Sequence, residues 1–336
     1  MSVPTVALGV GGIQTTALGF GCASLFRISS PAQRSRLLHA AYDVGIRHFD
    51  VAPMYGFGRA EPELGAFARS RRTELTIATK FGIKPTLVAR GFSHAQGPVR
   101  RAFQAKPAIR DHARAHGAAP SRLLYEMGGY HAPGARRSLE RSLRALNTDY
   151  VDLFLLHDPL PGSVRSDEVS SYLEDACAAG LIRSWGIAGE PESTGKVARS
   201  FREGIPIHQI RDDIFLQSLH YAPIGAAFVT FGVIVGALAC LVQHVSASDS
   251  RRLRWKRETG ADCGDPDIAA SFLMQAAFHE NSSGVVLLGT GHPSHIRNAV
   301  TALETFYSSD NSALDAFMHL VDAELRKAPS SETEDR

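Results

Sequence analysis

This sequence contains few lysines and few cysteines, and its net charge is small. The chain has 336 residues and a formal net charge of only +2. Because proteins that bind nucleic acid usually carry a clustered basic surplus, this balance predicts no nucleic-acid partner. The four cysteines form no CxxC pair, and their spacing argues against a disulfide framework or a zinc site. The few lysines are Lys80, Lys84, Lys106, Lys196, Lys256 and Lys327, so a lysine at the end of an apolar run is unusual here.

The sequence also shows no secretory signal and no convincing membrane span. Residues 1–12 have neither a basic region nor a long apolar core, so we expect a cytoplasmic protein. Residues 224–242 approach membrane-spanning length, but their flanks lack the basic bias and aromatic belts of such spans. We interpret this run as a buried strand over 228–235 followed by a helix that begins near Ala237.

Short apolar runs alternate with amphipathic stretches along most of the chain, which is typical of βα units and a parallel sheet. Eight such strands favour an α/β fold of the (β/α)8 TIM barrel type, with an N-terminal β-hairpin and an extra C-terminal helix. We expect a single barrel domain over 1–327 and a disordered tail over 328–336. The predicted strands span 18–22, 47–51, 74–81, 150–156, 182–188, 214–219, 228–235 and 284–288, and the hairpin uses 3–8 and 14–18. The predicted helices span 31–44, 61–71, 135–146, 167–179, 193–202, 267–278, 293–303 and 313–327.

Two features qualify this pattern. Residues 82–134 lack clear periodicity, apart from a possible helix over 108–116, and a loop of that length is often functional. A Rossmann fold would place GxGxxG after the first strand. Residues 19–24 read GFGCAS and lack the third glycine, so the barrel is the better interpretation.

Four polar residues lie at or just after strand ends, where the active site of a barrel is built. They are Asp50, Tyr55, Lys80 and His157. A free tyrosine has a pKa near 10, and a nearby ammonium such as Lys80 should lower it. Asp50 can hold Lys80 charged, and His157 can hydrogen-bond a carbonyl oxygen. Together they predict an acid, Tyr55, aimed at a carbonyl that accepts hydride from a cofactor.

Each of these residues alone also has an ordinary structural explanation. An aspartate at a strand end is often a turn residue, a lysine is usually exposed, and a single histidine is more often structural than catalytic. The prediction therefore depends on their joint placement on successive strands.

The motifs around these residues resemble the aldo-keto reductase family. Residues 49–56 read FDVAPMYG, 78–82 read ATKFG, 138–143 read SLERSL, 149–153 read DYVDL and 155–159 read LLHDP. The resemblance implies the barrel, a catalytic tetrad of Asp50, Tyr55, Lys80 and His157, and NADP(H) bound without a Rossmann domain. The HDP ending is similar to the branch of sugar and pyridoxal dehydrogenases.

The cofactor contacts that the resemblance implies are less regular. Gln217, at the end of the predicted sixth strand, corresponds to the nicotinamide contact, whereas the Ser-Asn pair after the fifth strand is replaced by Ala188 and Gly189. Residues 288–293, LGTGHP, resemble the phosphate loop. The implied phosphate contacts are Gly289, Thr290, Gly291, His295 and Asn298, with His295 in place of an arginine. NADP(H) is expected, and NAD(H) stays possible.

Two other functions compete with this interpretation. A metal-dependent barrel hydrolase would need clustered histidine and carboxylate ligands, and the sequence offers no HxH in its first strand. A slow nucleotide-binding sensor or regulatory subunit of the same fold stays open because the cofactor positions differ from the family. The expected partner is a small carbonyl or alcohol, with no nucleic acid, no membrane and no metal. Substrate, direction and oligomeric state are left open.

Overall fold

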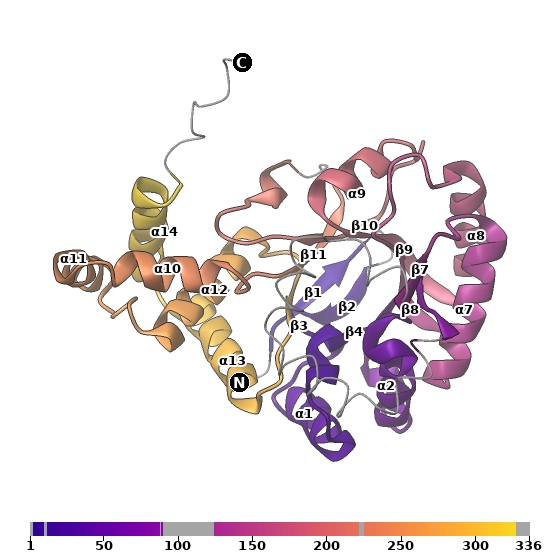
Figure 1. The fold of residues 1–336 in the computed structure, drawn as a ribbon, viewed down its shortest axis with the longest axis horizontal. Coiled ribbons are helices and arrows are strands. Elements are labelled where there is room, and N and C mark those ends of the chain that lie inside the picture. Colours follow the sequence, from indigo (N-terminus) through magenta and orange to yellow (C-terminus); the bar gives the residue numbers. More distant parts are fainter. Residues whose placement is uncertain (1–2, 10–11, 88, 90–123, 222–224, 327–336) are drawn as a thin grey trace.

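Eight parallel strands close into a barrel in the computed structural model, which describes residues 3–9, 12–87, 89, 124–221 and 225–326. Around the barrel the strands follow the order β10-β11-β12-β3-β4-β5-β8-β9. Helices surround them, as Figure 1 shows. The predicted TIM barrel is therefore confirmed. The predicted helix over 108–116 and the tail over 328–336 lie outside the described residues.

The barrel strands are short and fully or largely buried. They are β3 (Leu18–Gly21), β4 (His48–Asp50), β5 (Thr76–Phe81), β8 (Val151–His157), β9 (Ile182–Gly189), β10 (Ile207–Arg211), β11 (Ala227–Phe231) and β12 (Val285–Leu288). Two antiparallel pairs lie outside the barrel: β1 (Thr5–Leu8) with β2 (Ile13–Thr16), and β6 (Ile83–Pro85) with β7 (Tyr125–Met127). The first pair is the predicted hairpin.

The helices follow the strands as the alternating pattern predicts. They are α1 (Pro31–Asp43), α2 (Ala60–Ala68), α7 (Ala132–Leu146), α8 (Ser166–Ala178), α9 (Pro191–Ala198), α10 (Ala237–Val245), α11 (Asp249–Thr259), α12 (Pro266–Glu280), α13 (Pro293–Ser308) and α14 (Ser312–Glu324). Short 3-10 turns cover Cys22–Arg27, Tyr55–Gly58, Arg72–Glu74 and Ser218–Tyr221. Helix α1 begins as the sequence predicts, with the Ser30 side chain accepting a hydrogen bond from the Gln33 amide and Pro31 in the first turn.

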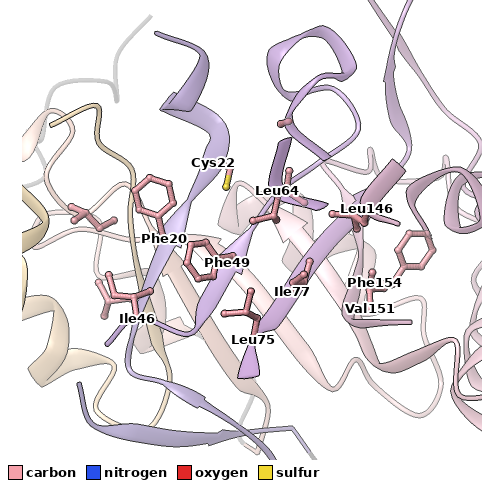
Figure 2. Close-up of a cluster of buried hydrophobic side chains, with 14 of the residues drawn as sticks. Phe20, Cys22, Ile46, Phe49, Leu64, Leu75, Ile77, Leu146, Val151 and Phe154 are labelled. Atoms are coloured by element: carbon pink, nitrogen blue, oxygen red, sulfur yellow. The ribbon is translucent and has the colours of Figure 1, made fainter. Parts of the chain in front are cut away.

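The outward faces of the strands pack against the helices and form the largest core cluster. Figure 2 shows this packing for Phe20, Phe49, Ile77 and Phe154 on the strands, with Leu64 of α2 beside them. The inward faces form a separate cluster, in which residues of the β1–β2 hairpin such as Leu8 and Ile13 meet the barrel interior. The hairpin therefore closes the N-terminal end of the barrel and leaves the C-terminal end for the site.

The sixth strand is where the sequence prediction is wrong. We expected it at 214–219, but the strand is β10, Ile207–Arg211. The residues His208, Gln209 and Arg211 make this strand look polar, yet the barrel buries His208 and Gln209. The seventh strand is also shorter than predicted, since it ends at Phe231 and is followed by two glycines with positive φ, Gly232 and Gly236.

A second apolar cluster lies beside the barrel, among α10, α11, α12 and α14. Its large members include Trp255, Phe272 and Phe317, all buried. In Figure 1 α10, α11 and α14 lie together to one side of the strands. The extra C-terminal helix, α14, is thus confirmed as part of this cluster. Among the described residues, none of the helices combines the length and hydropathy needed to cross a bilayer.

Buried His48 makes the stability of the fold sensitive to acid. The side chain of His48 is fully buried near the hairpin, and burial lowers its pKa to about 3, assisted by the charge of Lys80. In the unfolded chain His48 binds a proton near pH 6.5. The free energy of unfolding therefore keeps its full value above pH 6.5 and falls as the pH drops from 6.5 toward 3. The slope is about 1.4 kcal/mol per pH unit for one proton.

We expect the His48→Asn variant to show a shallower fall in stability between pH 6.5 and pH 3, where the histidine titrates. Urea unfolding at a series of pH values measures this slope. His39→Asn, which removes an exposed imidazole, is the matched control for loss of a histidine side chain. Equal slopes for the wild type and the His48 variant would refute the assignment.

Candidate active site

Three of the four predicted catalytic residues lie on the barrel strands, and the fourth follows one of them. Side chains alternate along a strand, so Lys80 lies on the same face as Ala78, and His157 on the same face as Leu155. Ala78 and Leu155 belong to the interior cluster. Lys80 and His157 therefore point into the barrel near its C-terminal end, where Asp50 ends β4.

Lys80 and Asp50 form a buried ion pair. Lys80 Nζ lies 2.7 Å and 2.6 Å from the two carboxylate oxygens of Asp50 and 3.2 Å from the Val51 carbonyl oxygen. Both side chains are almost fully buried. Burial favours the neutral amine, but the charge of Asp50 and the hydrogen bonds to Asp50 and Tyr55 outweigh it and raise the pKa of Lys80. Lys80 is therefore an ammonium held in a fixed position.

Tyr55 lies in a sharp turn beside this ion pair. Its hydroxyl is 3.5 Å from Lys80 Nζ. The turn depends on Gly56 and Phe57, both with positive φ, and the Phe57 ring stacks on Tyr125 at a centroid distance of 5.9 Å. A bulky residue with positive φ is strained, and such strain is common at functional sites.

The pKa of Tyr55 shifts in the direction opposite to the one we expected. Burial raises it to about 12, and Lys80 only partly opposes that rise. Desolvation of a phenolate thus outweighs one ammonium at 3.5 Å. Because its pKa is raised, the Tyr55 hydroxyl is protonated at neutral pH.

His157 completes the set. Its ring lies edge-on to that of Tyr55, with centroids 5.9 Å apart. Burial, assisted by Lys80, lowers the pKa of His157 well below its usual value, so the ring is neutral. Its Nδ1 is buried and has no partner among the described residues, while Tyr130 donates its hydroxyl hydrogen to the His157 carbonyl. The structure therefore brings Asp50, Tyr55, Lys80 and His157 together.

Gln209 is a site residue that the sequence analysis missed. It lies on β10, is 3% exposed, and hydrogen-bonds to Asp50. Its Oε1 is buried with no partner in the described part of the chain. Gln209 lies two residues after apolar Ile207 and therefore on the same, inward face of the strand. The sequence analysis did not use this spacing because it placed the sixth strand at 214–219.

Gln217, predicted to contact the cofactor, does not end a strand. It lies several residues after β10, in a loop that is held by a hydrogen bond from the Ser218 amide to the Asp212 carboxylate. With its amide oriented to accept, Gln217 lies 2.8 Å from Arg326 Nη1. Arg326 also donates to the Ile214 carbonyl. Gln217 therefore contacts Arg326, just after α14, rather than the ion pair.

The structure gives a reason for a glycine at position 189, where the sequence resemblance implied a Ser-Asn pair over 188–189. A Cβ on Gly189 would collide with the Asp158 carboxylate. Asp158 itself has positive φ, and its amide donates to the Ala188 carbonyl at 2.7 Å. The small residues Ala188 and Gly189 thus leave room for the backbone and the carboxylate of Asp158.

The loop from Gly289 to His292 connects β12 to the N-terminus of α13, and Thr290 organises it. The Thr290 hydroxyl lies 3.0 Å from His295 Nδ1 and accepts a hydrogen bond from the His292 amide at 3.1 Å. His295 and Asn298 are exposed on the first turns of α13. A helix N-terminus attracts anions, so this loop offers a place for a phosphate.

The geometry agrees with comparisons with known proteins. The sequence model of the Aldo/keto reductase family matches residues 17–215, more than half of the chain. The chain belongs to the aldo/keto reductase family. Within the described residues there is no group of three or more histidine, cysteine or carboxylate side chains placed to hold a metal ion.

Two similar proteins are named as an aldose dehydrogenase and a pyridoxal dehydrogenase. The chain is 32% identical over 195 residues to a D-threo-aldose 1-dehydrogenase from Pseudomonas sp, covering 56% of this chain and 54% of that protein. It is 34% identical over 155 residues to a pyridoxal 4-dehydrogenase from Microbacterium luteolum, covering 45% and 42%. The chain thus spans about half the length of these curated relatives. Its fold matches the holo form of an aldo-keto reductase from Bacillus halodurans with a TM-score of 0.68 at 19% identity, covering 97% of this chain and all of the other.

Proposed function

We propose that this aldo/keto reductase interconverts a carbonyl and an alcohol by hydride transfer, with NADP(H) as its cofactor and Tyr55 as the general acid and base. The observation that carries the proposal is the Asp50–Lys80 ion pair with the Tyr55 hydroxyl 3.5 Å from the ammonium. Its relatives named as an aldose and a pyridoxal dehydrogenase favour a small aldehyde or its hydrated or cyclic form as substrate.

The residues present fit a nicotinamide nucleotide. The orphaned Oε1 of Gln209 is a buried acceptor, which suits the amide hydrogens of a carboxamide. The Gly289–His292 loop and the N-terminus of α13 offer backbone amides to phosphate. When bound, the cofactor supplies or accepts the hydride. Of the predicted contacts, Gly289, Thr290, Gly291, His295 and Asn298 stay in this proposal, and Gln209 takes the place of Gln217.

The protein's own part is to move one proton and to stabilise charge. In reduction, the Tyr55 hydroxyl donates its proton to the carbonyl oxygen as negative charge develops there. Lys80 lies beside the phenolate that remains and stabilises it, while Asp50 keeps Lys80 charged. His157 is neutral and lies beside Tyr55. It donates a ring N–H to the carbonyl oxygen of the substrate and helps to orient that oxygen. Oxidation of an alcohol uses the same groups in reverse.

The experiment that tests the proposal is oxidation of NADPH and NADH by the purified protein against a panel of aldehydes and ketones, with dehydrogenation of aldoses and pyridoxal in reverse. Turnover with either nucleotide supports the proposal. Nucleotide binding without turnover on any panel member would favour the sensor function instead, and absence of nucleotide binding would refute both.

His295 sets the preference between the two nucleotides. It stands exposed at the N-terminus of α13, where the family motif has an arginine, and its Nδ1 is engaged by Thr290. With Nδ1 engaged, the imidazole has one ring nitrogen left for a phosphate, whereas a guanidinium binds a phosphate with two parallel N–H groups. We expect His295→Arg to tighten NADPH binding about tenfold or more and to leave NADH binding nearly unchanged. Fluorescence titration of both nucleotides measures this difference. Equal gains for NADPH and NADH would show that His295 does not face the 2′-phosphate.

A further inference from the structure

A buried arginine outside the catalytic set holds the loop between β3 and α1. Arg34, on α1, is 2% exposed. Its Nε and Nη2 lie 2.6 Å and 2.7 Å from the two carboxylate oxygens of Glu63 on α2. Its Nη1 donates to the carbonyl oxygens of Ile28 and Ser29, each at 2.8 Å. Burying a guanidinium is costly unless its donors are satisfied, and here one side chain ties the loop to α2.

The same loop presses on the turn that carries Tyr55. The Arg34 guanidinium lies 4.5 Å from the centroid of the Phe26 ring. Phe26 in turn packs on Gly56 so closely that a Cβ at Gly56 would overlap the ring. Because Gly56 follows Tyr55 directly, the position of Phe26 limits where the Tyr55 backbone can lie.

The other side of the loop contacts the proposed phosphate loop. The Ser24 hydroxyl donates to the Thr290 carbonyl oxygen at 3.3 Å. A Cβ on Gly291 would lie 3.6 Å from Ile28 Cγ1, which places Ile28 against the backbone of Gly291. The 22–30 loop therefore touches both the turn of the proton donor and the loop proposed to bind the nucleotide phosphate.

We propose that Arg34 is a positioning residue: by locking the 22–30 loop to Glu63, it fixes the Tyr55 turn relative to the Gly289–His292 loop. The kinetic part of this inference rests on the proposed function, and the structural part does not. Loss of the lock lets the two loops move independently. Turnover then falls because the phenol is misplaced, and nucleotide binding weakens because its loop loses support.

The chain provides a matched control at the opposite end of the barrel. Arg72 precedes β5 and lies 2.9 Å from the buried carboxylate of Asp152. It also donates to the carbonyl oxygens of Leu75 and Tyr150, each at 2.9 Å, and lies 3.9 Å from the Tyr150 ring centroid. Arg72 thus also joins a carboxylate to two backbone carbonyls, although it is less buried than Arg34 and contacts a single carboxylate oxygen, and it lies at the other end of the strands from the site. A purely structural role for Arg34 predicts equal effects from both replacements.

The test compares Arg34→Met and Arg72→Met with the wild type. Both should lower the melting temperature. Arg34→Met should also lower kcat by about tenfold to a hundredfold, because small misplacements of reacting groups are costly. It should raise the Kd of NADPH about tenfold, within the usual range of coupling between sites. Arg72→Met should leave kcat and Kd within about twofold, since distant sites are usually independent. Equal changes in kcat and Kd from the two replacements would overturn the proposal.

Hydrogen–deuterium exchange tests the structural part without any nucleotide. In Arg34→Met, exchange should accelerate together in 22–30, 54–60 and 289–292, whereas Arg72→Met should accelerate exchange only near 71–76 and 148–152. Unchanged exchange in 54–60 and 289–292 would overturn the coupling even if the enzyme assay failed, and failure of the wild type to bind nucleotide would refute the proposed function instead. Should Arg34→Met not fold, Arg34→Lys keeps the charge but loses the planar fork, and the same exchange pattern in weaker form is expected.

Discussion

Replacing Tyr55 by phenylalanine is expected to lower the turnover for carbonyl reduction by about 10²- to 10⁴-fold, the usual contribution of a positioned general acid. The variant keeps the aromatic ring, which lies edge-on to His157, and removes only the hydroxyl beside Lys80. Nucleotide binding should stay within about twofold, because the proposed carboxamide and phosphate contacts lie on other segments. Turnover close to that of the wild type would remove Tyr55 from the mechanism.

A neighbouring tyrosine supplies the control for loss of a phenol. Tyr125→Phe keeps the ring that stacks on Phe57 and deletes a hydroxyl close to the same turn. It should retain most of the turnover. A loss as large as that of Tyr55→Phe would mean that the turn, rather than the acid, had been damaged.

The pH dependence gives the same assignment an independent signature. With the pKa of Tyr55 at about 12, the phenol is fully protonated across the neutral range, so kcat for reduction should be independent of pH there. Dehydrogenation of the alcohol needs the phenolate, and its rate should rise about tenfold for each pH unit while chemistry limits the rate. A reduction rate that falls between pH 6 and pH 8 would place the acid on another group.

The four residues proposed to be catalytic could be found from the sequence because three of them, Asp50, Lys80 and His157, directly follow an apolar run that is visible locally. Lys80 ends a run of β-forming residues, and His157 ends another. The ends of these two strands can therefore be located from the sequence without knowing which strands lie beside them. The same local rule failed at β10. There, Gln209 and His208 are polar residues buried by the closure of the barrel, and an apolar run at 214–219 looked like the better strand.

The contacts that set the site's finer properties are non-local. The Tyr55 hydroxyl sits between groups on different strands, and only their geometry shows that burial outweighs Lys80 in setting its pKa. Gly189 is explained by Asp158, which directly follows the neighbouring strand, β8. Likewise, Arg34 and Glu63 are 29 residues apart in sequence. Pattern reasoning identifies strands and their ends, but not which side chains meet between them.

Replacing Lys80 by methionine is expected to lower both stability and turnover strongly. It would leave the Asp50 carboxylate buried, with its ammonium partner removed. Breaking a buried pair in this way costs about 3–5 kcal/mol of unfolding free energy. Turnover should fall by about 10²-fold or more, because the developing phenolate loses its stabilising charge. Urea unfolding and steady-state kinetics on the same preparation measure the two effects.

A double variant separates the stabilising role of the ion pair from its catalytic role. Asp50→Asn combined with Lys80→Met removes both charges, so much of the lost stability should return, as it does when a buried pair is replaced by neutral groups. Turnover should not return, because no ammonium then lies beside Tyr55. The corresponding change at the other end of the barrel, Arg72→Met with Asp152→Asn, removes a partly buried ion pair that does not touch the site, at a carboxylate that Arg183 also contacts, and should leave turnover near that of the wild type. If the Asp50/Lys80 double variant regained both stability and turnover, the pair would be purely structural, and Tyr55 would have to work without the charge beside it.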